Sequence, residues 1–260
     1  MDNSNLTISL AQYDIAWEDK EKNLTTVKNI LSKLAGTTDI VVLPEMSFTG
    51  FSLNMAAAEA PDGDLFTRIK QLAQESGIAV CGSVLTTENG NHYNRGFFIT
   101  PTESYFYDKR HLFRMGGEGR VITAGREKTI FNYKGFNINL QVCYDLRFPV
   151  WSRNVDNEYD LAIYVANWPE PRKKVWDILL KARAVENSCY VCGVNRVGRD
   201  NNNLSHSGLS TLIDAKGESL ILLPENKEAV ESIIIDKASL NKMRAKFPTW
   251  RDADKFEIKY

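Results

Sequence analysis

Short apolar runs rich in β-branched residues alternate with helix-like patterns along most of the 260-residue chain. The apolar runs have the length of strands, and the segments between them repeat apolar side chains every three or four residues, as amphipathic helices do. Residues 40–43 are apolar without interruption, which is typical of a strand buried on both faces. Strands are predicted at residues 6–12, 40–43, 78–85, 93–100, 104–108, 128–133, 136–142, 161–166, 189–195, 208–214, 219–223 and 231–236. Helices are predicted at residues 20–34, 62–76, 172–185 and 238–246.

So many strands with helices interspersed predict two stacked sheets covered by helices. No Pro/Gly/Ser-rich linker or block of like charge divides the chain, so residues 1–260 are expected to form a single domain. In the predicted helix 172–185, the apolar side chains define the face expected to turn inward. That face comprises Val175, Ile178, Leu179, Ala182 and Val185.

Charge and cysteine content narrow the class of protein. There are 32 Lys and Arg against 33 Asp and Glu, a net charge of −1. A near-neutral chain lacks the electrostatic attraction that nucleic acid or an anionic membrane requires, so neither is expected as a partner. Four cysteines are too few for a disulfide scaffold and suit a reducing compartment. The polar N-terminus shows no secretory signal pattern, so a cytoplasmic location is expected.

Several familiar kinds of catalytic and binding motif are absent. The three histidines show no metal-ligand spacing, and Cys189 and Cys192 form a CxxC with no second pair to complete a zinc site. Because these two cysteines lie in a predicted strand, we interpret them as buried core thiols. No nucleophile elbow, dinucleotide fingerprint or phosphate-binding loop occurs. No metal ion and no organic cofactor is therefore expected.

Three segments share one layout, in which a strand ends in a reactive polar residue near aromatic side chains. The polar residues are Glu45, Lys109 and Cys143. Carboxyl ends of strands collect ligands in open α/β folds, so these residues could meet although they are far apart in sequence. A cysteine thiol, with its ordinary pKa of ~8.5, needs a base or a nearby positive charge to act as a nucleophile at neutral pH. Glu45 could remove the proton, and Lys109 could favour the thiolate and stabilise an oxyanion.

Each of these residues also has an ordinary structural interpretation. A cysteine at the end of an apolar strand is more often part of the core than a nucleophile. A glutamate after a proline is usually a solvated turn residue, and a lysine beside an aspartate is usually one half of a surface pair. The residues alone therefore leave cysteine-based acyl transfer as one hypothesis among others.

A series of short blocks resembles the nitrilase superfamily of carbon–nitrogen hydrolases, and within it the bacterial ω-amidases. The blocks follow the family's chain order and span nearly the whole sequence. They are Ala11-Gln12, Leu43-Pro44-Glu45, the run from Asp108 to Phe113, the run from Cys143 to Pro149, the run from Tyr164 to Pro169, the run from Arg183 to Asn187, the run from Asn195 to Gly198, and Phe247-Pro248.

The resemblance implies a four-layer α-β-β-α sandwich that assembles as a homodimer through one helical face. It assigns Cys143 as nucleophile, Glu45 as general base and Lys109 as the cation that stabilises the oxyanion. The backbone N–H of Tyr144 is expected to be the second oxyanion donor. Glu118, seven residues before Gly125, matches the family's additional active-site glutamate, which orients the lysine and the substrate.

The resemblance also implies the reaction. The expected substrate is a small dicarboxylate monoamide such as 2-oxoglutaramate, hydrolysed to the acid and ammonia through a cysteine thioester. A guanidinium would hold the distal carboxylate, with Arg147 as the first candidate and Arg110 and Arg114 as alternatives. The aromatic side chains expected to line the pocket are Phe48, Phe113, Phe148 and Trp168. Arg183 and Glu186 are expected to form a structural ion pair, and His111 to support the site from behind.

Other functions remain open at the level of sequence. Nitrile hydrolysis, N-carbamoyl amide hydrolysis and acyl transfer use the same three residues as amide hydrolysis. A catalytically idle binding protein on the same scaffold is a further alternative, although an intact Glu45, Lys109 and Cys143 would have no purpose in it.

Overall fold

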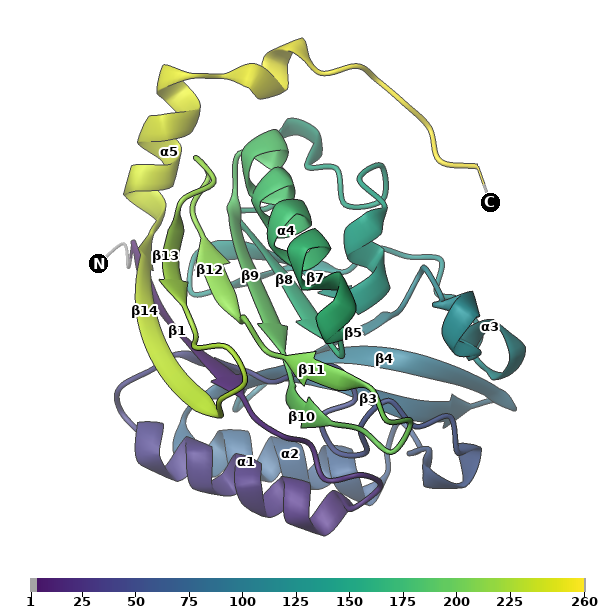
Figure 1. Cartoon of the computed structure of the whole chain (residues 1–260). Helices are drawn as coiled ribbons and strands as arrows, with labels where there is room; N and C mark the ends of the chain where they lie inside the picture. Colours follow the sequence, from purple (N-terminus) through teal and green to yellow (C-terminus); the bar gives the residue numbers. More distant parts are fainter. Residues whose placement is uncertain (1–3, 260) are drawn as a thin grey trace.

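A computed structural model describes residues 4–259, which form two six-stranded sheets lying face to face (Figure 1). The first sheet has the order β14 (Ala229–Asp236), β1 (Asn5–Gln12), β2 (Ile40–Val42), β3 (Ala79–Glu88), β4 (Asn91–Ile99) and β5 (Ser104–Asp108). The second has the order β13 (Ser219–Leu222), β12 (Thr211–Ile213), β9 (Tyr190–Asn195), β8 (Leu161–Ala166), β7 (Phe136–Val142) and β6 (Ile130–Tyr133).

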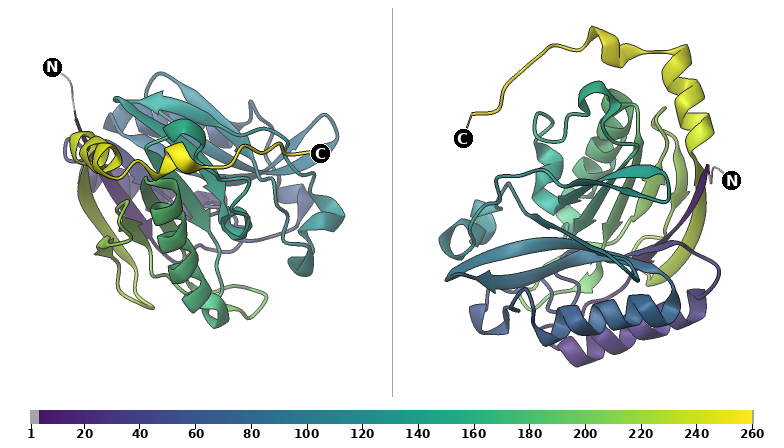
Figure 2. Two further views of the ribbon diagram at one scale, coloured as in Figure 1. Left: turned by 90° about the horizontal axis from the view of Figure 1, so that it is seen from above. Right: turned by 180° about the vertical axis from the view of Figure 1, so that it is seen from behind.

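Helices cover the outer faces of the two sheets. The helices are α1 (Lys20–Leu34), α2 (Asp64–Ser76), the short α3 (Glu118–Val121), α4 (Lys173–Asn187) and α5 (Lys237–Lys246). The pair α1 and α2 lies along the first sheet, and α4 lies across the second (Figures 1 and 2). The four layers confirm the predicted α-β-β-α sandwich.

The apolar runs explain this layering, as β2 illustrates. Ile40 and Val42 point into the core between the sheets, whereas Val41 and Leu43 point into the core beneath α1 and α2. All four side chains are fully buried. A strand covered on both faces has no solvent side, which is why its sequence is apolar without alternation.

Local signals set the ends of the two covering helices. The carboxylate of Asp19 accepts the N–H of Lys22 at 3.0 Å and caps the start of α1. Gly77 ends α2 in the left-handed conformation, with φ of 71°, which a residue without Cβ adopts at little cost. The predicted bounds of α1 are confirmed, and α2 begins two residues later than predicted.

The inward face predicted for α4 is confirmed for Val175 and Leu179, which are half-buried against the core, and is wrong for Ile178 and Val185. Ile178 and Val185 are 63% and 52% exposed, and the buried positions are Trp176, Leu180, Arg183, Ala184 and Asn187. Arg183 is buried because its guanidinium donates to the carbonyl of Leu146 and pairs with Glu186 at 2.8 Å. Because the polar Arg183 and Asn187 lie on the buried face of α4, this face differs from the one that the apolar residues alone indicate. The predicted Arg183–Glu186 ion pair itself is confirmed.

A two-stranded hairpin was not predicted. It consists of β10 (Val197–Arg199) and β11 (Ser205–Ser207), with His206 opposite Gly198. Both strands have three residues and carry polar side chains, so they show neither the length nor the alternation by which strands are recognised. The missed hairpin matters because its loop reaches the site described below. No helix among residues 4–259 is long and apolar enough to cross a membrane.

Candidate active site

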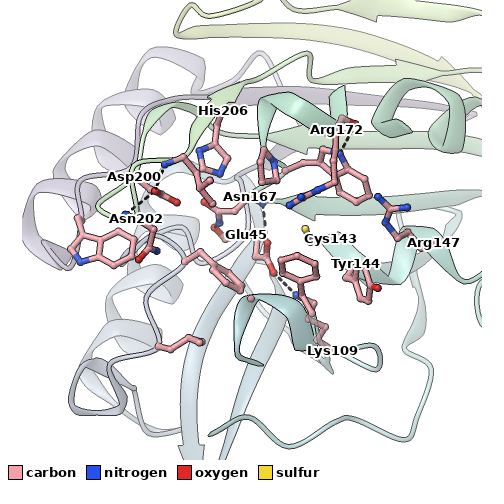
Figure 3. Close-up of a pocket in the computed structure, with 18 residues that line it drawn as sticks. Glu45, Lys109, Cys143, Tyr144, Arg147, Asn167, Arg172, Asp200, Asn202 and His206 are labelled. Carbon is pink, nitrogen blue, oxygen red and sulfur yellow. Dashed lines mark hydrogen bonds and ion pairs between the residues drawn. The ribbon is translucent and has the colours of Figure 1, made fainter. Parts of the chain in front are cut away.

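The strand directions bring the predicted site residues together. Within each sheet the central strands are parallel, β1 with β2 and β3 in one and β7 with β8 and β9 in the other. β5 runs the same way as β3, because each is antiparallel to β4. Glu45 and Lys109 follow the carboxyl ends of β2 and β5, and Cys143 follows that of β7. Figure 3 shows these three side chains converging on one cavity.

Glu45 is fully buried and held at both ends of its carboxylate. Its Oε1 accepts from Lys109 Nζ at 2.7 Å, and its Oε2 accepts from the backbone N–H of Asn167 at 2.9 Å. The side-chain amide of Asn167 also donates to the carbonyl of Glu45. Because Asn167 follows β8, these bonds join the two sheets at the site. The carboxylate therefore has a fixed position and no contact with bulk water.

Glu118 supplies a second buried carboxylate around the same lysine. Lys109 Nζ lies 2.9 Å from each carboxylate oxygen of Glu118, and the backbone N–H of Phe113 donates to Oε2 at 2.6 Å. Burial opposes the charge on Lys109, but the two carboxylates outweigh it and raise its pKa above the ordinary value. The lysine is therefore cationic throughout the physiological range. Glu118 thus contacts Lys109, as predicted.

Cys143 begins a short 3-10 helix, Cys143–Arg147, directly after β7. Its φ of 44° is in the left-handed region, which is rare for a residue with a side chain and common at functional sites. Burial raises the pKa of the thiol well above its ordinary value, and the negative charge of Glu45 raises it further. Lys109 acts in the opposite direction, as expected, but is outweighed. The thiol is therefore neutral at rest and needs a base.

The carboxylate of Asp145 ties the Cys143 turn to the segment after Lys109. One oxygen accepts from both the backbone N–H and Nδ1 of His111 at 2.8 Å, and the other accepts from the hydroxyl of Tyr107 at 2.8 Å. The backbone N–H of Val142 donates to the same carboxylate at 3.2 Å. His111 thus supports the site from behind, as predicted, and does not line the cavity.

A cavity of about 300 Å³ opens beside Cys143. Six residues predicted around the nucleophile line it, namely Glu45, Lys109, Phe113, Tyr144, Arg147 and Trp168. Whether the backbone N–H of Tyr144 binds an oxyanion stays a prediction, since that role depends on a bound substrate.

Four other predicted positions lie elsewhere. The Phe148 ring stacks on His111 with centroids 3.8 Å apart, and Phe48 is buried in the core beneath α1 and α2. Arg110 Nη1 donates to the carbonyl of Gly125, and neither Arg110 nor Arg114 lines the cavity. The prediction of Phe48 and Phe148 as pocket walls is wrong, because the first packs into the core and the second packs on His111.

Arg172 is a cavity residue that the sequence did not indicate. It comes shortly after β8, and its Cζ lies 5.3 Å from the centre of the Phe113 ring. Arg147 lies similarly over the Trp168 ring, at 5.1 Å. Among the described residues, no carboxylate forms an ion pair with either guanidinium. The cavity therefore holds two guanidinium groups that have no ion-pair partner among residues 4–259.

The missed hairpin forms the opposite wall (Figure 3). Asp200, Asn202, Leu204 and His206 line the cavity there. The carboxylate of Asp200 accepts the backbone N–H groups of Asn202 and Leu204, both at 2.9 Å, and so shapes the hairpin loop. Burial and the charge of Arg196 lower the pKa of His206 to about 4, so its imidazole is neutral at neutral pH. Only folding places this segment near Cys143, more than fifty residues earlier.

The remaining cysteines have no part in the site. Cys81, Cys189 and Cys192 are free and fully buried in the core, which confirms the interpretation of the CxxC as core thiols. Across residues 4–259, no group of three or more His, Cys, Asp or Glu side chains is arranged to hold a metal ion.

Comparisons with known proteins give the relationship of this chain. Residues 7–245 match the carbon-nitrogen hydrolase family. The chain is 42% identical to omega-amidase YafV of Escherichia coli strain K12, over 97% of this chain and 98% of that one. It is 31% identical to 2-oxoglutaramate amidase of Bacillus subtilis strain 168, over 96% and 98% of the two chains.

Solved structures agree with the sequence matches. A CN-hydrolase superfamily protein from Xanthomonas campestris, solved with an arsenic adduct in its active site, superposes with a TM-score of 0.96. It is 41% identical, and the match covers 98% of this chain and 99% of that one. With the fold, the site and these matches in agreement, the chain belongs to the carbon–nitrogen hydrolase family and is an enzyme of the nitrilase superfamily.

Proposed function

We propose that this enzyme is a thiol-dependent amidase that hydrolyses the terminal amide of a small dicarboxylate monoamide, such as 2-oxoglutaramate. One observation carries the proposal: a buried Glu45–Lys109–Glu118 network adjoins the neutral thiol of Cys143 at the edge of one cavity. The activities named for the E. coli and B. subtilis relatives support the choice of an amide and of its class.

The first half of the reaction forms a thioester. Glu45 takes the proton of Cys143 as the sulfur adds to the amide carbonyl, because the buried thiol does not ionise unaided at neutral pH. The oxyanion is stabilised by Lys109 and the backbone N–H of Tyr144. The proton on Glu45 then passes to the leaving nitrogen, the carbon–nitrogen bond breaks, and ammonia departs.

The second half releases the acid. Glu45 takes a proton from a water molecule as its oxygen adds to the thioester carbonyl. The carbon–sulfur bond then breaks, and the proton returns to the sulfur of Cys143. Each group ends in the protonation state in which it began, so the protein's own residues complete the cycle.

The two arginines of the cavity account for the second carboxylate of the substrate. Arg147 and Arg172 face the cavity without a carboxylate partner among the described residues, and a guanidinium binds a carboxylate through two parallel hydrogen bonds. The Cζ atoms of Arg147 and Arg172 lie 5.1 Å and 5.3 Å from the centres of the Trp168 and Phe113 rings, so an aromatic ring lies beside each guanidinium. A substrate with an uncharged tail would leave both positive charges unpaired inside the cavity.

The test is ammonia release from 2-oxoglutaramate, glutamine, an N-carbamoyl amino acid and an aliphatic nitrile, measured side by side. We expect the oxoamide to be the fastest and Cys143→Ala to release none while remaining folded. A faster rate on the nitrile or on the carbamoyl compound would replace the proposed reaction with one of the alternatives. Turnover by Cys143→Ala would overturn the assignment of the nucleophile.

The arginines are tested with a pair of substrates. For Arg147→Leu and Arg172→Leu, kcat/KM on the monoamide should fall by at least about tenfold, and kcat/KM on an uncharged aliphatic amide should change little. Arg251→Leu is the control, because Arg251 is exposed on a C-terminal 3-10 helix away from the cavity. Equal losses on both substrates would show that the arginines have a structural role.

A further inference from the structure

A buried asparagine on β4 contacts both carboxylates of the site. Asn94 is fully buried, and its Nδ2 lies 2.8 Å from Glu45 Oε1 and 3.1 Å from Glu118 Oε1. A side-chain amide has two N–H donors, so one can serve each carboxylate. The backbone carbonyl of Asn94 accepts the N–H of Lys109 at 3.0 Å. Asn94 therefore contacts all three members of the charged network, yet it does not line the cavity.

The charges of this network do not cancel. Two carboxylates share one ammonium while the thiol of Cys143 is neutral, so a net negative charge is buried in side chains that are at most 1% exposed. Like charges at a buried site favour uptake of a proton by one of them. A protonated Glu45 could not accept the proton of Cys143, so the site needs additional donors to its carboxylates.

Asn94 supplies such a donor without a second positive charge. Each N–H of its amide can bond one carboxylate, and a hydrogen bond to an ionised carboxylate favours the ionised form.

We propose that Asn94 is a positioning residue, which holds Glu45 and Glu118 around Lys109 and keeps Glu45 ionised as the general base. The inference rests on the proposed role of Glu45 and assigns Asn94 no contact with substrate. It goes beyond a packing role because it predicts a change in pH dependence.

The experiment compares Asn94→Ala with Asn139→Ala. Asn139 is a matched control: it is fully buried on β7, its Nδ2 has no partner and its Oδ1 accepts from Gln141, but it does not contact the charged network. For each protein, kcat/KM for 2-oxoglutaramate is measured from about pH 5 to about pH 9. In Asn94→Ala the acid limb, the fall in kcat/KM as the pH is lowered, should move to higher pH by about one unit, so the loss relative to wild type is larger on this limb than on the plateau. Asn139→Ala should keep the wild-type limb.

A second readout does not depend on the substrate. The rate at which iodoacetamide alkylates Cys143 also requires an ionised Glu45, and its acid limb should shift by the same amount in Asn94→Ala. A wild-type enzyme inactive on amides would refute the proposed function but leave this alkylation test in force. An unchanged limb in both measurements, or an equal loss at every pH, would overturn the inference.

Folding is checked by circular dichroism and thermal unfolding. If Asn94→Ala fails to fold, Asn94→Ser takes its place, since serine keeps a donor too short to reach both carboxylates. The shifted limb is then expected in Asn94→Ser. If neither variant folds, the role of Asn94 is structural and the inference is wrong.

Discussion

Replacing Glu118 with glutamine tests whether the buried network positions Lys109 for catalysis. The substitution keeps the shape of the side chain and removes its charge. In the wild-type structure, both carboxylate oxygens lie 2.9 Å from Lys109 Nζ, and Glu118 is fully buried. Glutamine keeps one oxygen that can accept from Lys109. Its N–H₂ group takes the place of the second carboxylate oxygen, so a donor then faces the donor of the lysine.

The size of the effect follows from the contacts that are lost. A hydrogen bond to a charged group contributes about 1.5–3 kcal/mol, and about 1.4 kcal/mol corresponds to a factor of ten in rate. Loss of one such contact therefore lowers kcat by about 10- to 150-fold. Glu118 does not line the cavity, so KM should change by less than about threefold. Lys109 keeps its 2.7 Å contact with Glu45, so the protein should remain folded.

The assay is continuous ammonia release across a range of substrate concentrations, with thermal unfolding measured in parallel. Glu103→Gln is the control, because that acid is exposed and bonds only to the Tyr105 hydroxyl among its side-chain contacts. A kcat within about twofold of wild type would refute the positioning argument. A large rise in KM at unchanged kcat would instead place Glu118 in contact with substrate.

Four further outcomes are expected. Cys143 should react with iodoacetamide before the fully buried Cys81, Cys189 and Cys192. Peptide mass spectrometry after partial labelling measures this, and equal labelling of all four cysteines would show that Cys143 is not more reactive than the others. The pKa values of Lys109 and Cys143 are both raised, so the ammonium and the neutral thiol persist as the pH rises. We therefore expect no decline in kcat/KM on the alkaline side below about pH 9. A decline near pH 8 would contradict this prediction. Lys109→Met leaves two buried carboxylates without a cation, so the free energy of unfolding measured by urea titration at neutral pH should fall by about 3–5 kcal/mol. The loss should be smaller in acid, where the carboxylates take up protons. An unchanged urea midpoint would refute this prediction. Finally, we propose that two copies of the chain associate through α4, where Ile178 and Val185 are exposed. The double variant Ile178→Glu, Val185→Glu should sediment as a monomer and wild type as a dimer. Identical sedimentation would exclude this face of α4 as the dimer interface.

Sequence patterns predicted the elements best where burial is symmetrical or a local signal marks an end. The uninterrupted apolar run of β2 and the N-cap of α1 are examples. The prediction of the inner face of α4 was wrong in part, because Arg183 and Asn187 are buried there with their polar groups bonded to neighbouring segments. Hydrophobic periodicity assumes that polar side chains face water, and it fails where the fold supplies partners for them.

The site divides in the same way. Glu45, Lys109 and Cys143 could be named from the sequence because each follows a recognisable strand and lies in a block that resembles the family. Parallel strands bring their carboxyl ends to one edge. Arg172 and His206 could not be named, since no pattern around them indicates chemistry. Phe148 was misplaced because a sequence position next to a functional residue does not fix which way a side chain points.

The order of strands and helices, the sandwich class and the reactive residues were thus determined by the sequence itself, through local patterns and short motifs. The tertiary structure alone decided which side chains share the cavity and that the thiol of Cys143 is neutral. The physical reason is that burial, electrostatics and hydrogen bonding depend on distances between segments far apart in the chain. Asn94 is the clearest case, because an ordinary residue of a strand acquires its importance from two carboxylates that only folding brings to it.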